Sequence, residues 1–236
     1  MSLAVLVPSR GRPQNIERLI EAFDRTASIA HLMIGLDADD PELERYRQLP
    51  NRAWIHWHVA ENTRGVVAWI NLLADLYTPL YEYVGTIGDD NVPRTRLWDE
   101  RVIESLARQG TGFCFADDGY ELRPKGTLCT HVFLTADIIR ALGYFGPPQL
   151  RHLYVDPVWM EWGQRTSIEF LGDVLIEHLH HSNGKAPLDD TYRSADANYR
   201  GDHDAFHEYY QNGLMADVQK IHGLRLSQHT HLHHRP

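Results

Sequence analysis

The sequence predicts an α/β fold in which a mostly parallel sheet carries helices on both faces. The first observation is that short apolar segments alternate with amphipathic segments of helical spacing through the first 110 residues. The second is that each apolar segment ends in a polar loop. The third is that this unit recurs three times, which implies right-handed crossovers between parallel strands.

Composition narrows the class of protein. The 236 residues are 43% hydrophobic, which is enough for one compact domain with a proper core. The net charge of -9, without a Lys or Arg run, gives no strong footprint for nucleic-acid binding. Cys114 and Cys129 lie in apolar sequence rather than in a paired framework, which favours a reducing, cytoplasmic location. No segment approaches the roughly 20 apolar residues of a membrane span.

Four strand-and-loop units make up the first half. Leu3 to Val7 is a continuous apolar run, typical of a strand buried on both faces, and Pro13 suits the first turn of a helix. The later units repeat this pattern. Strands are expected at 31–36, 54–59 and 81–87, and helices at 42–49, 67–77 and 96–109.

The second half departs from this repeat. Its expected elements are strands at 112–116, 128–134 and 170–179, a helix opening at 154–157 and a polar helix at about 202–221. We expect a single domain over residues 1–222, with halves at 1–110 and 111–200 and a His-rich tail at 223–236.

Polar loops at the ends of the first four strands are expected to share one edge of the sheet. These loops are Ser9–Arg10, Asp37–Asp39, Asn62–Arg64 and Asp89–Asn91. Ligands bind at the carboxyl ends of strands in open α/β sheets. The adjacent carboxylates of Asp89 and Asp90 suit a divalent cation that also grips phosphates. The alternative is that they cap a strand-ending turn.

The motifs occur in a recognisable order. The first strand runs into Val7–Pro13, the second ends in Asp-rich sequence, and Gly88–Asn91 reads as an Asp-x-Asp-type motif. Asp156, and His178 or His180, extend the pattern. On these residues the chain resembles the GT-A glycosyltransferases, especially the small family-2-like nucleotide-sugar transferases of bacteria and phages.

The resemblance covers about residues 3–192. It implies a Rossmann-like GT-A fold whose nucleotide-binding half is residues 1–110, with a smaller acceptor-side β/α region after it. It also implies that the protein is located in the cytosol of a bacterium or of a phage-infected host. The usual motif ends in a carboxylate, whereas this one ends in Asn91, which leaves open whether Asp89 or Asp90 binds the metal directly.

For the metal, the resemblance implies ligands from Asp89, Asp90 and Asn91, completed by His178 or His180. An imidazole ligand favours Mn, with Mg as the alternative. The two histidines are expected on one face of the late strand, because side chains two residues apart share a face. Ordinary packed or exposed roles are the alternative for each histidine.

For the donor, the resemblance implies a nucleotide-sugar site. Its residues are Pro8, Ser9, Arg10, Asp37, Asp39, Asn62, Arg64 and Asp89. Arginine suits phosphate as a planar donor of several hydrogen bonds, and a carboxylate accepts well from a base imide or sugar hydroxyl. The competing roles are a solvated loop for the arginines and helix capping for Asp39.

For the acceptor, Asp156 is expected to take the proton of a hydroxyl in an inverting reaction, with Glu161 as the second candidate base. N-capping of the helix that starts near Pro157 is the alternative for Asp156. The polar segment from Lys185 to Tyr192 is expected to be a surface loop, with a lid over the donor as the alternative.

The expected function is therefore a metal-dependent glycosyltransferase that uses a nucleoside-diphosphate sugar, a UDP-sugar in the first place. One alternative is a sugar-phosphate nucleotidyltransferase, although the first loop has only one of the glycines that such enzymes carry there. Another is a non-catalytic nucleotide-sugar-binding protein. The acceptor stays open among a saccharide, a protein hydroxyl and a modified nucleobase.

Overall fold

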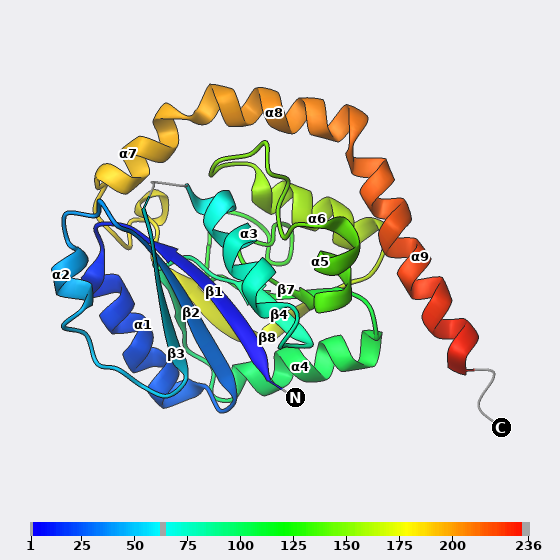
Figure 1. Cartoon of the computed structure of the whole chain (residues 1–236), viewed down its shortest axis with the longest axis horizontal. Coiled ribbons are helices and arrows are strands. Elements are labelled where there is room, and N and C mark those ends of the chain that lie inside the picture. Colours follow the sequence, from blue (N-terminus) through cyan, green and yellow to red (C-terminus); the bar gives the residue numbers. More distant parts are fainter. Residues whose placement is uncertain (1, 62–64, 233–236) are drawn as a thin grey trace.

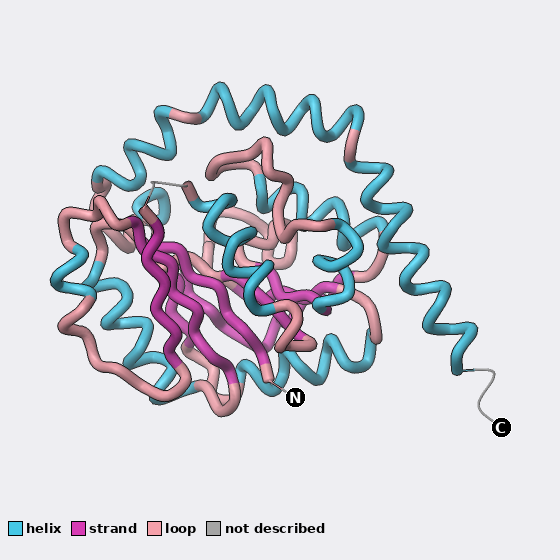
Figure 2. The backbone as a smooth tube through the Cα atoms, in the orientation of Figure 1, coloured by secondary structure: helices cyan, strands magenta, loops and turns pink. Residues whose placement is uncertain are grey.

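The computed structural model describes residues 2–61 and 65–232, with side chains to residue 227. In this part of the chain, eight strands form one mixed sheet in the order β3-β2-β1-β4-β7-β6-β8-β5. Figure 2 shows these strands gathered together with helices around them. The strands are β1 (Leu3–Ser9), β2 (Ala30–Asp37), β3 (Ile55–Ala60), β4 (Tyr83–Thr86), β5 (Asn91–Pro93), β6 (Phe113–Asp117), β7 (Val132–Thr135) and β8 (Ile168–His178).

The helices alternate with the strands in the first half and gather at the end of the chain (Figure 1). They are α1 (Pro13–Thr26), α2 (Leu43–Tyr46), α3 (Val66–Tyr77), α4 (Trp98–Gln109), α5 (Ala136–Leu142), α6 (Val155–Arg165), the 3-10 turn η1 (His181–Asn183), α7 (Asp190–Ala197), α8 (Tyr199–Asn212) and α9 (Leu214–Leu232).

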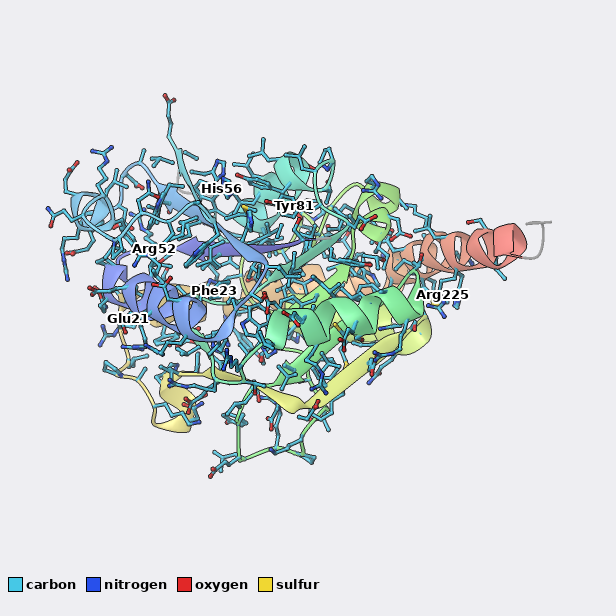
Figure 3. All side chains as sticks on the ribbon, turned by 90° about the horizontal axis from the view of Figure 1, so that it is seen from below. Glu21, Phe23, Arg52, His56, Tyr81 and Arg225 are labelled. Atoms are coloured by element: carbon cyan, nitrogen blue, oxygen red, sulfur yellow. The ribbon has the colours of Figure 1, made fainter. Side chains whose placement is uncertain are left out.

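The first half of the sheet is parallel, as predicted. β1 pairs in parallel with both β2 and β4, and β2 pairs in parallel with β3. Successive residues of β1 enter two different cores: Leu6 packs on the side of α3, and Val5 packs on the side of α1 and α4. Burial on both faces explains the continuous apolar run. On α1, Phe23 is buried whereas Glu21 is exposed (Figure 3).

The second half is mixed rather than a further strand–helix repeat, also as predicted. β7 is antiparallel to β4 and β6, β8 is parallel to β6, and β5 is antiparallel to β8. The strand predicted at 128–134 is shorter and begins at Val132, and its four residues pair with the four residues of β4. The helix predicted at 42–49 is reduced to the four residues of α2.

The prediction of one helix at 202–221 is wrong. Gly213 separates α8 from α9, and a Cβ there would lie 2.7 Å from the Tyr209 ring. The Tyr209 hydroxyl donates to Asp217 at 2.7 Å across this bend, and the Trp162 indole donates to the Tyr209 hydroxyl at 2.7 Å, so a tertiary contact helps to hold it. α9 also continues past residue 223 and carries Arg225 (Figure 3). The Arg225 guanidinium donates to the Thr111 carbonyl. No described helix is long and apolar enough to cross a membrane.

Candidate functional site

The turn after β4 carries the two adjacent carboxylates. The Asn91 side-chain carbonyl accepts a hydrogen bond from the Gly88 amide at 2.6 Å, and the Asn91 amide donates to the Gly88 carbonyl at 3.0 Å. A Cβ at Gly88 would lie 2.5 Å from a carboxylate oxygen of Asp90. Side-chain oxygens of Asp90 and Asn91 thus crowd the space beside Gly88, and Asn91 shapes the turn.

Asp89 points toward the loop that follows β1. It is 6% exposed. The Ser9 hydroxyl donates to one of its oxygens at 2.6 Å, and the Arg12 guanidinium donates to the other at 3.1 Å. Burial raises the pKa of Asp89 to about 6, and the positive charge of Arg12 opposes that rise. Both carboxylate oxygens thus have donors from the protein.

Asp90 faces β8 and α7. The Tyr192 hydroxyl donates to one oxygen at 2.7 Å, and His178 Nε2 lies 3.3 Å from the other. Burial raises the pKa of Asp90, but the charge and hydrogen bonds of its neighbours, His178 first, outweigh burial and bring the pKa below its usual range. Burial alone would lower the pKa of His178, but the negative charge of Asp90 outweighs it, and the pKa of His178 is raised. Asp90 and His178 therefore stabilise each other as an ion pair.

Asp90 and His178 offer an oxygen and a nitrogen atom that suit a divalent metal. The carboxylate oxygen and the imidazole nitrogen are close enough to reach one ion together. Within residues 2–61 and 65–232, no three His, Cys, Asp or Glu side chains converge to hold an ion by themselves. One or two protein ligands suffice where substrate phosphates complete the coordination. The residues therefore fit a metal that binds together with a nucleotide.

The other predicted ligands lie around this pair. The oxygens of Asp89 and Asn91 already accept hydrogen bonds from the surrounding loops. The prediction that His180 shares a strand face is wrong, because β8 ends at His178. His180 instead precedes η1 and accepts a hydrogen bond from the Ser182 amide at 3.2 Å. Its ring centroid still lies 5.1 Å from that of His178.

The sequence analysis did not select Arg12, and it placed Tyr192 in a surface loop, with a lid over the donor as the alternative. Arg12 is only 4% exposed; it donates to Asp189 at 2.6 and 2.7 Å and lies 3.8 Å from Asp90. Its guanidinium stacks 4.1 Å from the centre of the Tyr192 ring. The segment predicted as a surface loop thus closes over the carboxylates, and Asp189 caps α7. The local sequence held no signal for these contacts, since both residues stand in polar stretches.

The predicted nucleotide residues meet beside the first two strands. Arg10 donates to Asp37 at 3.0 Å and to Asp39 at 2.5 Å. The Trp69 indole donates to the other oxygen of Asp37 at 2.9 Å. Gly35 makes room for this ring, because a Cβ there would lie 2.5 Å from it. The carboxylate of Asp37 is therefore fixed between β2, α3 and the first loop.

The predicted shared edge exists for the described loops. Ser9 contacts Asp89, and Arg10 contacts Asp37, so the ends of β1, β2 and β4 meet. Pro8 lies opposite Gly35 in the parallel register of β1 and β2. Asn62 and Arg64 lie outside the described residues.

Asp156 stands in the first turn of α6. It is not the N-cap: that position is Tyr154, whose φ of 66° is unusual for a residue with a side chain. Its carboxylate has no hydrogen-bond partner within the described residues, whereas its backbone carbonyl is contacted by Cys129 Sγ at 3.6 Å. Burial raises the pKa of Asp156 to about 6, and His178 is the first of the nearby cations that oppose the rise. A half-buried carboxylate thus stands near His178, and it is ionised at pH 7.

Glu161 does not join this group. It pairs with Arg165 at 2.8 Å, one turn further along α6. At about 100° per residue, it points about 140° around the helix axis from Asp156.

Asp118 and His131 are two further polar residues that the sequence analysis did not select. Asp118 pairs with Arg123 and accepts from Thr130 at 2.8 Å. His131 is fully buried, and its Nε2 accepts from the Ala116 amide at 3.1 Å. Burial lowers the pKa of His131 to about 4, so the ring is neutral at pH 7. The charge of Asp118 acts on the pKa of both His131 and His178, so these three residues lie near one another.

The mixed eight-stranded sheet of the described residues, with its surrounding helices, is an α/β fold, as predicted, and the likeness to the solved structures below shows that it is of the GT-A type. No family model matches the chain, and no curated protein matches its sequence. Solved structures match in three dimensions. TarS 1-349 from S. aureus, in complex with UDP, has a TM-score of 0.58 at 13% identity, over 75% of this chain and 60% of that one.

Two further structures support the same fold. The mannosyltransferase PcManGT from Pyrobaculum calidifontis, with GDP-Man and Mn²⁺, has a TM-score of 0.59 at 11% identity, over 94% of this chain and 73% of that one. Rv0371c from Mycobacterium tuberculosis H37Rv, with manganese, has a TM-score of 0.53 at 14% identity, over 78% and 96%. At such identities the likeness shows the fold alone. The chain spans about 60% of the length of the TarS 1-349 structure.

Proposed function

We propose that this protein is a metal-dependent glycosyltransferase that moves a sugar from a nucleoside-diphosphate sugar to an acceptor hydroxyl. The observation that carries the proposal is the neighbourhood of Asp90, His178 and Asp156. Asp90 and His178 suit a metal–diphosphate complex, and they lie close enough to the half-buried Asp156 for their charges to act on the pKa of Asp156. Glycosyl transfer needs both: charge stabilisation for the leaving group and a base for the incoming hydroxyl.

The donor is proposed to be a UDP-sugar. Among structures with this fold, TarS is solved with UDP and with UDP-GlcNAc, and PcManGT with GDP-Man. The proposed contacts come from the first loop and the end of β2, where Arg10 and Asp37 present a cation and a carboxylate side by side. Pro8, Ser9, Asp39 and the undescribed Asn62 and Arg64 complete the proposed set.

Asp90 and His178 would hold the metal, with Mn²⁺ proposed and Mg²⁺ as the alternative. A bound divalent ion supplies charge stabilisation to the departing diphosphate without any proton transfer. Asp89 is held by Ser9 and Arg12, so its proposed role is to orient the turn and the nucleotide beside the ion. The positive charge of Arg12 favours the ionised form of both adjacent carboxylates, although burial still raises the pKa of Asp89 to about 6.

Asp156 is proposed as the base of an inverting reaction. Such a base must lie across the sugar from the leaving phosphate and accept the hydroxyl proton directly. With a pKa of about 6, its carboxylate is ionised at pH 7 yet more basic than an ordinary Asp, which increases the driving force for accepting a proton. The acceptor class stays open among the saccharide, protein hydroxyl and modified nucleobase.

The test is release of nucleoside diphosphate from a panel of nucleotide sugars, in Mn²⁺, Mg²⁺ or EDTA. Transferases of this kind also transfer sugar slowly to water, so no acceptor is needed. We expect metal-dependent release from one donor, lost in Asp90→Asn and kept in Asp173→Asn, whose carboxylate lies on the surface.

Three other results would redirect the proposal. Donor binding without turnover under every condition would mean a nucleotide-sugar-binding protein. Formation of a nucleotide sugar from a sugar 1-phosphate and a nucleoside triphosphate would mean a nucleotidyltransferase. Absence of binding to every donor tried, with or without metal, would refute the nucleotide-sugar site itself.

A further inference from the structure

A pair of histidines lies on α8, outside the residues used above. His203 and His207 are four residues apart, so they occupy the same face of the helix. Their Nε2 atoms are 3.1 Å apart, and their ring centroids 4.3 Å apart. The two nitrogens therefore point at a common place rather than past one another.

The carboxylate of Asp204 lies beside the ring of His203. One of its oxygens lies 3.1 Å from His203 Nδ1. A carboxylate accepts the Nδ1–H of a neutral histidine, which leaves the lone pair of Nε2 free. Carboxylate–histidine pairs of this kind orient metal ligands.

The spacing of the nitrogens matches a shared metal ion. With bonds of about 2.0–2.1 Å to each nitrogen, a separation of 3.1 Å corresponds to an angle of about 95–100° at the metal. Tetrahedral and octahedral ions accept angles in this range. A proton shared between the two nitrogens satisfies the same geometry, and a metal would replace that proton.

We propose that His203 and His207 form a transition-metal site, for a borderline ion such as Zn²⁺, Ni²⁺ or Cu²⁺. Imidazole nitrogen favours these ions over Mg²⁺ and Ca²⁺. In the described part of the chain no third ligating side chain joins the pair. The remaining coordination positions are therefore open to water or to an external ligand, and the ion is exchangeable.

The site lies where α8 meets the loop before α6. Asp202, next to His203, accepts hydrogen bonds from the Arg151, His152 and Leu153 amides at 2.8, 3.0 and 2.7 Å. The Tyr154 ring packs against His203 with centroids 5.7 Å apart. A metal on α8, the arc at the top of Figure 1, would thus stiffen the helix turn that anchors the loop leading into α6. The inference does not depend on the proposed function.

Calorimetric titration of the full chain with Zn²⁺ tests the site, together with Cu²⁺ and electron paramagnetic resonance to count coordinating nitrogens. All variants are made in a background whose C-terminal histidines are replaced by alanine, so that these do not bind the added metal. The replaced residues are His229, His231, His233 and His234.

We expect His203→Ala and His207→Ala each to abolish the same one site, and the two-nitrogen copper signal with it. Asp204→Asn should weaken that site about tenfold or more, because it removes the carboxylate that orients His203. Glu208→Gln is the matched control: it removes the same charge from the same stretch of helix, next to His207. It should leave the affinity unchanged.

Three results would overturn the inference. One is an unchanged number of sites in both histidine variants. Another is two independent weak sites, each lost separately, which would mean unconnected surface histidines. The third is equal weakening by Asp204→Asn and Glu208→Gln, which would mean a general effect of charge.

Discussion

Replacement of Arg12 by methionine tests how adjacent carboxylates stay ionised inside the protein. The guanidinium lies 3.1 Å from Asp89 and 3.8 Å from Asp90, and all three side chains are nearly buried. Methionine keeps much of the aliphatic stem and removes the charge together with its hydrogen bonds. The variant therefore leaves two neighbouring carboxylates without their shared cation.

The size of the effect follows from burial. Removing one partner of a buried ion pair costs about 3–5 kcal/mol, because the other charge stays out of water. The Asp189 side chain is 39% exposed, so loss of its pair with Arg12 adds at most about 1 kcal/mol. We expect Arg12→Met to lower the free energy of unfolding by about 3–5 kcal/mol at pH 7.5.

The loss of unfolding free energy in Arg12→Met should become smaller as the pH falls. Burial raises the pKa of Asp89 to about 6 in the folded protein, and Arg12 opposes that rise, so the variant has a still higher value. An acid whose folded pKa exceeds its unfolded value near about 3.9 destabilises the fold when ionised. The penalty is complete above the folded pKa and diminishes as protonation neutralises the carboxylate.

Urea unfolding followed by tryptophan fluorescence, at pH 7.5 and pH 5.0, measures both effects. Arg101→Met is the control, because Arg101 is half exposed and pairs with Asp173 on the surface. It should lose at most about 1 kcal/mol at either pH. A loss below about 1 kcal/mol in Arg12→Met, or equal losses at the two pH values, would refute the reasoning.

Three further predictions concern single side chains. Asp156→Asn should slow sugar transfer by about 10²–10⁴-fold; in the wild type, kcat should fall about tenfold per pH unit below pH 6, because the pKa of this base is about 6, and a flat profile would contradict its role. Asp202→Ala should lower the free energy of unfolding by about 3 kcal/mol, about 1 kcal/mol for each of three backbone amides left without an acceptor; thermal unfolding beside Asp204→Ala checks this, and equal losses would exclude the amide contacts as the cause. The free energy of unfolding should fall as the pH drops from 6.5 toward 4, because His131 is protonated in the unfolded chain while burial keeps it neutral in the fold. His131→Gln should reduce the slope of the free energy of unfolding against pH by up to about 1.4 kcal/mol per pH unit. An unchanged slope would show that other groups cause it.

Much of the fold could be read from local patterns. The apolar run at Leu3–Val7 became β1, and the helical spacing after Pro13 became α1, because the period of apolar residues reflects burial of the same segment. The errors came where tertiary contacts override local preference. At the break between α8 and α9, Trp162 donates to the Tyr209 hydroxyl and Tyr144 donates to Asp217, and a helical pattern cannot indicate such distant partners.

The candidate site was predicted unevenly. The contact of Ser9 with Asp89, and that of Arg10 with Asp37, follow from parallel strands ending at one edge, so the sequence was enough to place these loops together. Their individual roles stay predictions. Tyr192 was assigned to a surface loop because its neighbours are polar, yet its hydroxyl binds Asp90 and its side chain is buried.

The sequence by itself determined the parallel half of the sheet and the edge that carries the polar loops, because hydrophobic period and turn residues act over a few positions. Only the tertiary structure decided which charges meet. Arg12 and Asp189 are 177 residues apart, and Tyr192 and Asp90 are 102 residues apart. A polar side chain takes the partner that the packed elements bring within hydrogen-bond distance, and that choice leaves no trace in the sequence around either residue.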